Sequence, residues 1–181
     1  MANDVVNVFR IDCDSIAVPL IEAEITGLVA ELRAGTKFGV DAQWQPQNWQ
    51  TLRFVSPWAP DFDMQDNLTK RLCAVHPSVV VWNFYCEEFL QAVGVRLSTL
   101  SSGQVDSVTE DAAIVLADIV GWDNEATENE WNYEAIERAV GALQAKCADK
   151  AVATWAARQS IPVAGVDLDP YYVVALGLHN Y

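Results

Sequence analysis

Residues 54–89 read FVSPWAPDFDMQDNLTKRLCAVHPSVVVWNFYCEEF, and this stretch decides the fold. It divides into a strand, a helix and a second strand. The helix is predicted over 62–75, where apolar residues recur on one helical face: Met64, Leu68, Leu72 and Val75. It ends before Pro77, because the residue preceding a proline resists helical backbone geometry. The strand over 79–86 carries apolar side chains on both faces, which is typical of a central strand.

Elements on either side extend this unit. Residues 5–11 are rich in β-formers and predict a strand. A helix follows over 16–34, with Ser15 as its N-cap and Pro19 in its tolerant first turn. Its apolar face is predicted to contain Leu20, Ile21, Ile25, Leu28, Val29 and Leu32. Gly35 is a plausible stop for this helix, and strands are expected over 37–44 and 50–56.

The element order to residue 86 is therefore β-α-β-β-α-β. This is the split pattern of ferredoxin-like α+β folds, in which an antiparallel sheet carries two helices on one face. A further hairpin is predicted over 92–108, where the letters Ser-Ser-Gly indicate the turn.

The chain changes character after residue 108. Ser107 and Glu110 have the spacing of a capping box, which predicts a short helix over 110–120, with a strand as the alternative. A long helix is predicted over 132–159, with Ile136, Val140, Leu143, Cys147 and Ala151 on its seam. Residues 170–181 are a candidate edge strand. The expected organisation is a ferredoxin-like core over 1–108 and an acidic helical extension over 109–181, packed on the core as one compact unit.

Composition restricts the partners. The chain has 181 residues, half of them hydrophobic, and a net charge of −14. This charge opposes nonspecific binding to nucleic acid or to an anionic membrane, and it favours a basic protein partner. The four cysteines lack zinc-ligand spacing, so neither a metal nor another cofactor is expected. No signal peptide and no apolar run of membrane-spanning length are recognised. We therefore expect a cytoplasmic protein with free thiols.

The central stretch is similar to a ferredoxin-like domain family of plasmid and phage accessory proteins. In that family a strand enters a Trp-Ser/Ala-Pro-like turn, followed by a helix, a proline, and a strand with tyrosine and acidic residues. The matching positions here are Trp58, Pro60, Pro77, Tyr85, Glu87 and Glu88, with an upstream Asn48-Trp49. The family's Gly-Thr-Lys-Trp-like sequence is missing, and the part after 108 is unmatched. The resemblance implies a mobile-element origin and a fold, and it supplies no catalytic residues.

Three patterns suggest chemistry, and each also has a structural explanation. Asp12 and Asp14 follow a strand and could bind a divalent metal with Asp167 and Asp169, but no phosphate-binding loop accompanies them. Carboxylates at that place also suit the start of a helix. Cys73 and His76 lie three residues apart on one helix, without an orienting partner. Glu87 and Glu88 point to opposite faces of a strand, so they do not easily share one site.

The strongest signal is an acidic run. Ten carboxylates and no Lys or Arg lie between Arg96 and Arg138: Asp106, Glu110, Asp111, Asp118, Asp123, Glu125, Glu128, Glu130, Glu134 and Glu137. Like charges repel, and a basic partner would relieve that repulsion. Trp122, Trp131 and Tyr133 are residue types favoured as interface anchors. The predicted partner-binding residues are Trp122, Asp123, Glu125, Glu128, Glu130, Trp131, Glu134 and Glu137. The alternative is a solvated acidic loop whose tryptophans face the core.

These observations lead to a functional hypothesis. The chain is predicted to be a non-enzymatic, acidic inhibitor from a phage or plasmid, acting in a bacterial cytoplasm. It would occupy the basic, nucleic-acid-binding surface of a host protein as an anti-CRISPR or anti-restriction protein, partly mimicking DNA. Two alternatives stay open: an immunity protein that neutralises a basic nuclease toxin, and a metal-dependent enzyme that uses Asp12, Asp14, Asp167 and Asp169. Oligomeric state is not predicted.

Overall fold

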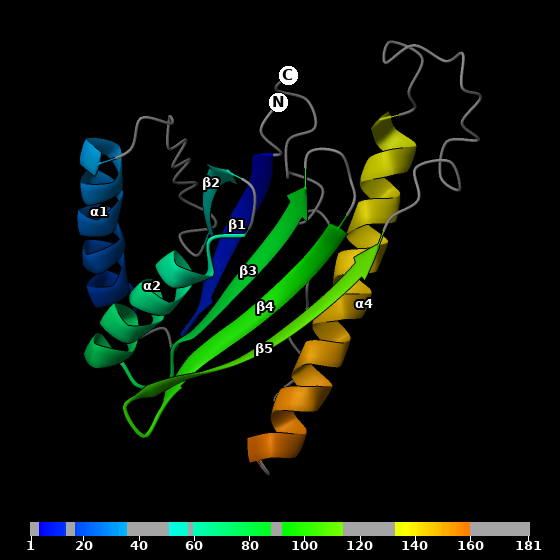
Figure 1. Ribbon diagram of the computed structural model, residues 1–181. Helices are drawn as coiled ribbons and strands as arrows, with labels where there is room; N and C mark the ends of the chain where they lie inside the picture. Colours follow the sequence, from blue (N-terminus) through cyan, green and yellow to red (C-terminus); the bar gives the residue numbers. More distant parts are fainter. Residues whose placement is uncertain are drawn as a thin grey trace.

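The computed structural model describes residues 4–13, 17–35, 51–57, 60–87, 92–113 and 133–159. These residues form an α+β fold around one five-stranded sheet, with the strand order β2-β1-β3-β4-β5 and antiparallel neighbours throughout (Figure 1). The strands are β1 (Asp4–Asp12), β2 (Thr51–Pro57), β3 (Val80–Glu87), β4 (Ala92–Ser101) and β5 (Gln104–Ala113). The helices are α1 (Val18–Gly35), α2 (Phe62–Val75) and α4 (Tyr133–Gln159).

Strand β3 lies at the centre of the sheet, as its two apolar faces predict. Trp82, Phe84 and Cys86 are buried on one face, and Val81 is buried on the other. Alternate residues of a strand point to opposite faces, so a strand covered by helices on both sides must be apolar on both.

Helices α1 and α2 pack together on one face of the sheet, as expected (Figure 1). Their core with the sheet contains Phe9, Ile11, Ala17, Ile21, Ile25, Leu28, Leu68, Leu72, Cys73, Val79 and Val81. The predicted apolar face of α1 was wrong at Leu20, which is 56% exposed. The buried stripe runs through Ile21, Ile25 and Leu28, and Leu20 lies a full residue step, about 100°, away from Ile21 around the helix.

Helix α2 begins and ends where the sequence predicts. Asp61 caps its start, because the Asp61 carboxylate accepts a hydrogen bond from the Met64 amide at 2.9 Å. His76 caps its end in extended backbone, and its own amide donates to the Leu72 carbonyl. Both ends of α2 are thus specified by neighbouring residues, which explains why local sequence signals located them.

Helix α4 packs on the opposite face of the sheet, against β4 and β5 (Figure 1). Of its predicted seam, Val140, Cys147 and Ala151 are buried and Leu143 is partly buried against the same core. Gln144 and Ala148 complete the buried side. The prediction of a long helix over 132–159 is confirmed by the bounds of α4, and the seam residues whose burial is described face the core.

The β4–β5 hairpin corrects one prediction. A two-residue turn at Ser102 and Gly103, both with positive φ, joins the strands, and β5 then continues to Ala113. The short helix expected from Glu110 was therefore wrong over 110–113, and Ser107 is a strand residue, not an N-cap. Pairing with β4 supplies partners along the whole of β5 and overrides the local capping signal. The boundary expected after residue 108 falls within this strand.

The topology contains one split β-α-β unit. Strands β2 and β3, joined through α2, lie on either side of β1. The expected strand over 37–44 and the candidate edge strand over 170–181 lie outside the described residues. Among the helices that the structure describes, none is long and apolar enough to cross a membrane.

Candidate partner-binding surface

The predicted partner-binding residues lie almost entirely outside the described part of the chain. This applies to Trp122, Asp123, Glu125, Glu128, Glu130 and Trp131. Glu134 and Glu137 fall in the first turns of α4, although their side chains are not described. Carboxylates at the start of a helix interact favourably with its macrodipole. By position, Glu134 lies within the turn over which this effect acts, and Glu137 lies beyond it.

Strand β5 carries the described part of the same acidic run. Asp106, Glu110 and Asp111 lie on β5, which contains no Lys or Arg and forms one end of the sheet. The register places Asp106 and Glu110 on the face of α4, together with the buried Val108, and Asp111 on the opposite face. Asp111 is exposed, and Asp106 and Glu110 are partly exposed. The negative charge thus lies along an outer strand.

These three carboxylates belong to the acidic run but are not among the predicted partner-binding residues. The capping-box spacing favoured a helix from Glu110, with a strand as the alternative, so their common position on one strand was not predicted. The signal that would have found them was present: the Ser102-Gly103 turn, followed by Val105, Ser107, Thr109 and Asp111 as one alternating set. In a hairpin, a two-residue turn fixes the register of everything that follows it.

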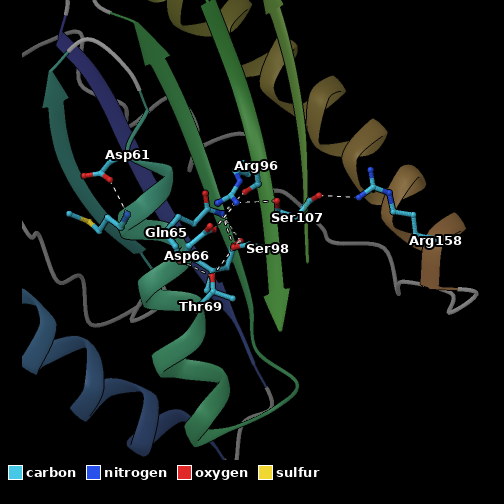
Figure 2. Close-up of polar contacts among 10 residues, drawn as sticks. Asp61, Gln65, Asp66, Thr69, Arg96, Ser98, Ser107 and Arg158 are labelled. Carbon is cyan, nitrogen blue, oxygen red and sulfur yellow. Dashed lines mark hydrogen bonds and ion pairs between the residues drawn. The ribbon is translucent and has the colours of Figure 1, made fainter. Parts of the chain in front are cut away.

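Arg96, the last basic residue before the acidic run, is turned into the protein (Figure 2). Its side chain is 8% exposed, and its Nη2 lies 2.6 Å from Asp66 Oδ1. Nη2 also donates to Ser107 Oγ at 3.0 Å, and the guanidinium stacks over the Phe62 ring at 4.9 Å. Arg96 therefore ties β4 and β5 to α2, and its charge is committed to Asp66 and does not pair with the acids of β5.

A polar cluster beside Arg96 fixes α2 on the sheet (Figure 2). Gln65 Nε2 lies within hydrogen-bonding distance of the Val81 carbonyl, the Arg96 carbonyl and Ser98 Oγ, at 2.9 to 3.0 Å. Thr69 Oγ1 lies 2.8 Å from Ser98 Oγ. All of these side chains are buried, and buried polar groups are costly unless they are paired. The cluster sets the position of α2 against β3 and β4.

A second polar cluster joins β1, β2 and β3 to the start of α2. Asn7 Nδ2 donates to Ser56 Oγ at 2.7 Å, and Asn7 Oδ1 accepts from Asn83 Nδ2 at 3.0 Å. The Asp61 amide donates to the same Asn7 oxygen at 3.2 Å. Asn7 thereby orients the residue that caps α2. In both clusters most of the buried amide and hydroxyl groups are bonded to one another or to backbone carbonyls, while Gln65 Oε1 and Asn83 Oδ1 have no partner among the described residues.

Arg158, in the last turn of α4, is a basic residue that approaches an acid of β5. Its Nη1 lies 3.6 Å from Asp106 Oδ1 and donates to the Ser107 backbone carbonyl at 3.0 Å. The Arg158 side chain is 52% exposed, so water and salt screen this contact. Glu110 and Asp111 have no ion pair within the described ranges. Among the described residues, the acidic strand is therefore only partly neutralised.

The described residues contain no cluster of ligands that would support the predicted metal site. Asp12 Oδ2 accepts from the Trp82 indole at 2.8 Å, and Asp12 Oδ1 accepts from Arg10 Nε at 3.0 Å. Both oxygens are thus engaged by donors that a cation would have to displace. Asp14, Asp167 and Asp169 lie outside the described residues, and within those residues no group of three or more metal-ligating side chains is found.

Cys73 and His76 each contact a neighbouring group other than the other member of the pair. Cys73 is buried, and its Sγ donates to the Val79 carbonyl at 3.5 Å. Burial raises the pKa of the Cys73 thiol, which disfavours the thiolate that a nucleophile requires. His76 ends α2, with its Nδ1 2.8 Å from Ser78 Oγ. The side chain of Glu87 is not described, and Glu88 lies outside the described residues.

Comparison with known proteins gives no relative: no family model, no curated protein and no solved structure matches the chain. The resemblance to plasmid and phage accessory proteins therefore stays a prediction. Of the residues that carry it, four lie in described parts of the chain: Pro60, Pro77, Tyr85 and, without its side chain, Glu87. Tyr85 is buried, with its ring edge-on to Phe62 at 5.7 Å.

Proposed function

We propose that this chain is an acidic binding protein that occupies the basic, nucleic-acid-binding surface of a partner protein and thereby inhibits it. A phage or plasmid protein acting against host defence in the bacterial cytoplasm fits this description. The observation that carries the proposal is the outward placement of negative charge on β5, while Arg96 is held inside by Asp66. The acidic run continues from β5 through residue 137 without a basic residue.

The physical argument concerns repulsion. Carboxylates fixed close together on a folded surface repel one another, and water and salt relieve this only in part. A partner with clustered Lys and Arg relieves it on binding, and the two opposite fields accelerate encounter. DNA presents a comparable line of negative charge, so a protein that evolved to bind DNA offers a complementary surface.

The fold supports display of such a surface. The sheet is braced by α1 and α2 on one face and α4 on the other, so β5 is held in place while its outer side faces away. We further propose that the strand expected over 37–44 adds to the free side of β2. That addition would place a β-strand on each side of the pair β1 and β2 and would complete the ferredoxin-like arrangement.

The test compares two variants with the same change in charge. Changing Glu125, Glu128, Glu130 and Glu134 to Lys alters the charge by eight units, two at each residue. A matched control changes four acidic residues elsewhere: Glu22, Glu31, Asp63 and Asp149, all exposed. Each protein is immobilised and used at low salt to capture basic proteins from a bacterial lysate, and elution is attempted with duplex DNA.

The proposal predicts that the original protein and the control variant capture the same protein and that DNA releases it. Association with the purified partner slows at least about tenfold in the first variant, and much less at high salt, because charges are screened beyond roughly 8 Å at physiological ionic strength. If the first variant captures and binds that protein as the original does, the acidic run is a solvated surface and the proposal fails.

A further inference from the structure

The outer side of β5 carries backbone groups that pair with no other strand among the described residues. The two residues that flank a two-residue hairpin turn form both backbone hydrogen bonds with each other. Further along the hairpin, hydrogen-bonded pairs alternate with pairs that are not hydrogen-bonded. Ser101 and Gln104 flank the turn, so the pairs Leu97–Val108 and Val95–Glu110 are bonded across the hairpin. The amides and carbonyls of the alternate set point away from β4: Val105, Ser107, Thr109, Asp111 and Ala113. No strand of the described residues lies beyond them.

One of these outward groups already holds a guanidinium. The Ser107 carbonyl accepts a hydrogen bond from Arg158 at 3.0 Å, which confirms that it points outward (Figure 2). The same side chain approaches Asp106. At this point the edge of β5 therefore binds a basic side chain, whose donors face the Ser107 carbonyl and the Asp106 carboxylate.

The negative charge of β5 determines which kind of strand could pair with its outer side. Natural proteins often protect an outer strand with lysine, whereas β5 carries Asp106, Glu110 and Asp111 and no basic residue. A second copy of the chain would bring a second set of these carboxylates and a second charge of −14. A segment rich in Lys or Arg would instead find opposite charges on β5.

Helix α4 places a partly buried tryptophan against the core on the same side of the sheet as Val108. Trp155 lies one turn before Arg158 and packs, partly buried, against the core that includes Val108. Its Nε1 is buried and donates to no acceptor within the described ranges. Half-buried tryptophans are favoured anchors when a partner covers them.

We propose that the edge of β5 is a docking site for an extended, lysine- or arginine-rich segment of the partner, which adds to the sheet as a new strand next to β5. The segment displaces Arg158 from Ser107 and pairs with the outward groups of Thr109 and Asp111. Backbone hydrogen bonds supply a sequence-independent part of the affinity, and the carboxylates select the charge. This inference rests on the proposed function, because it names the form that the basic partner takes at the binding surface.

The experiment uses two synthetic peptides and the full-length protein. The first peptide, about ten residues long, combines lysine with valine and threonine, which favour extended backbone. The second has the same number of lysines but proline at alternate positions, so it cannot pair along a strand. Binding is followed by calorimetry, and hydrogen exchange reports the amides of β5. We expect the first peptide to bind at least about tenfold more tightly and to protect the Thr109 and Asp111 amides.

Two protein variants separate strand addition from charge attraction. Thr109→Pro removes an outward amide hydrogen and leaves the bonds to β4 in place, because Thr109 belongs to the outward set. Thr109→Val keeps the amide and is the matched control. We expect Thr109→Pro to weaken the first peptide at least about tenfold, and Thr109→Val to leave it unchanged. Arg158→Ala should tighten binding, because the competing guanidinium is gone.

The outcomes distinguish the two proposals. If both peptides bind equally, or if Thr109→Pro binds as Thr109→Val does, the attraction is purely electrostatic; the edge proposal is overturned and the proposed function stands. If Thr109→Pro does not fold, the comparison of the two peptides on the original protein decides alone. Dimerisation of Arg158→Ala in sedimentation, without peptide protection of β5, would show that a second copy is the occupant and would also overturn the edge proposal.

Discussion

Replacing Gly94 by alanine should destabilise this protein, although the same change usually stabilises a strand. Glycine has no side chain to pack and loses the most backbone freedom on folding, so alanine is ordinarily better by about 0.5–1 kcal/mol. In β4, however, a Cβ at position 94 would be driven into the Tyr85 ring, touching Oη and Cζ and lying 2.7 Å from Cε2. The ring lies directly across the glycine.

The ring has little room to move. Tyr85 is 4% exposed, and its ring meets Phe62 edge-on at an interplanar angle of 70°. Phe62 in turn stacks under Arg96. Overpacking of a filled core typically costs 1–3 kcal/mol. Because the ordinary gain from alanine offsets part of this cost, we expect Gly94→Ala to lower the free energy of unfolding by about 1–2 kcal/mol, measured by urea denaturation followed by circular dichroism.

A double-mutant cycle tests the cause. In a Tyr85→Val background the ring is absent, so Gly94→Ala should cost nothing or stabilise, and the coupling between the two sites should reach about 2 kcal/mol. Gly27→Ala is the control: it lies in α1 with only Arg71 Nη2 at 4.0 Å from its new Cβ, and it should gain about 0.5–1 kcal/mol. Equal losses from Gly94→Ala in both backgrounds would refute the argument.

Three further predictions concern charged and titratable groups. Asp66→Asn should lower the free energy of unfolding by about 2 kcal/mol, because it leaves the buried Arg96 guanidinium unpaired, whereas Asp63→Asn on the exposed side of α2 should cost about 0.5 kcal/mol in the same urea titration. Arg71→Ala should cost less than about 1 kcal/mol, because its partners on α1 are exposed enough for solvent to screen them, and a larger loss of unfolding free energy in urea would contradict this. Burial raises the pKa of the Cys73 and Cys147 thiols above the ordinary 9.0, so the folded state holds these protons longer than the unfolded state and stability should fall as pH rises through 9.0. Urea titrations of the double Cys→Ala variant should show a shallower fall, and an unchanged slope would show that other groups cause it.

Elements with local signals could be predicted from the amino-acid sequence. Helix α2 was located at both ends because Pro77 stops it and its apolar residues keep one period. The long helix α4 followed from its seam in the same way, and β3 was recognised as central because both of its faces are apolar. Periodicity is a property of the chain alone, so it is visible before the chain folds.

Features that depend on strand pairing and on packing became visible in the folded protein alone. Ser107 and Glu110 have the spacing of a helix cap, yet their pairing with β4 makes them strand residues and so places the acids of β5 on an edge. Gln65 and Ser98 look like surface residues in sequence, but they meet between α2 and the sheet and are fully buried. The energy of a strand ladder or a buried hydrogen bond depends on a partner distant along the chain, and no local pattern contains that partner.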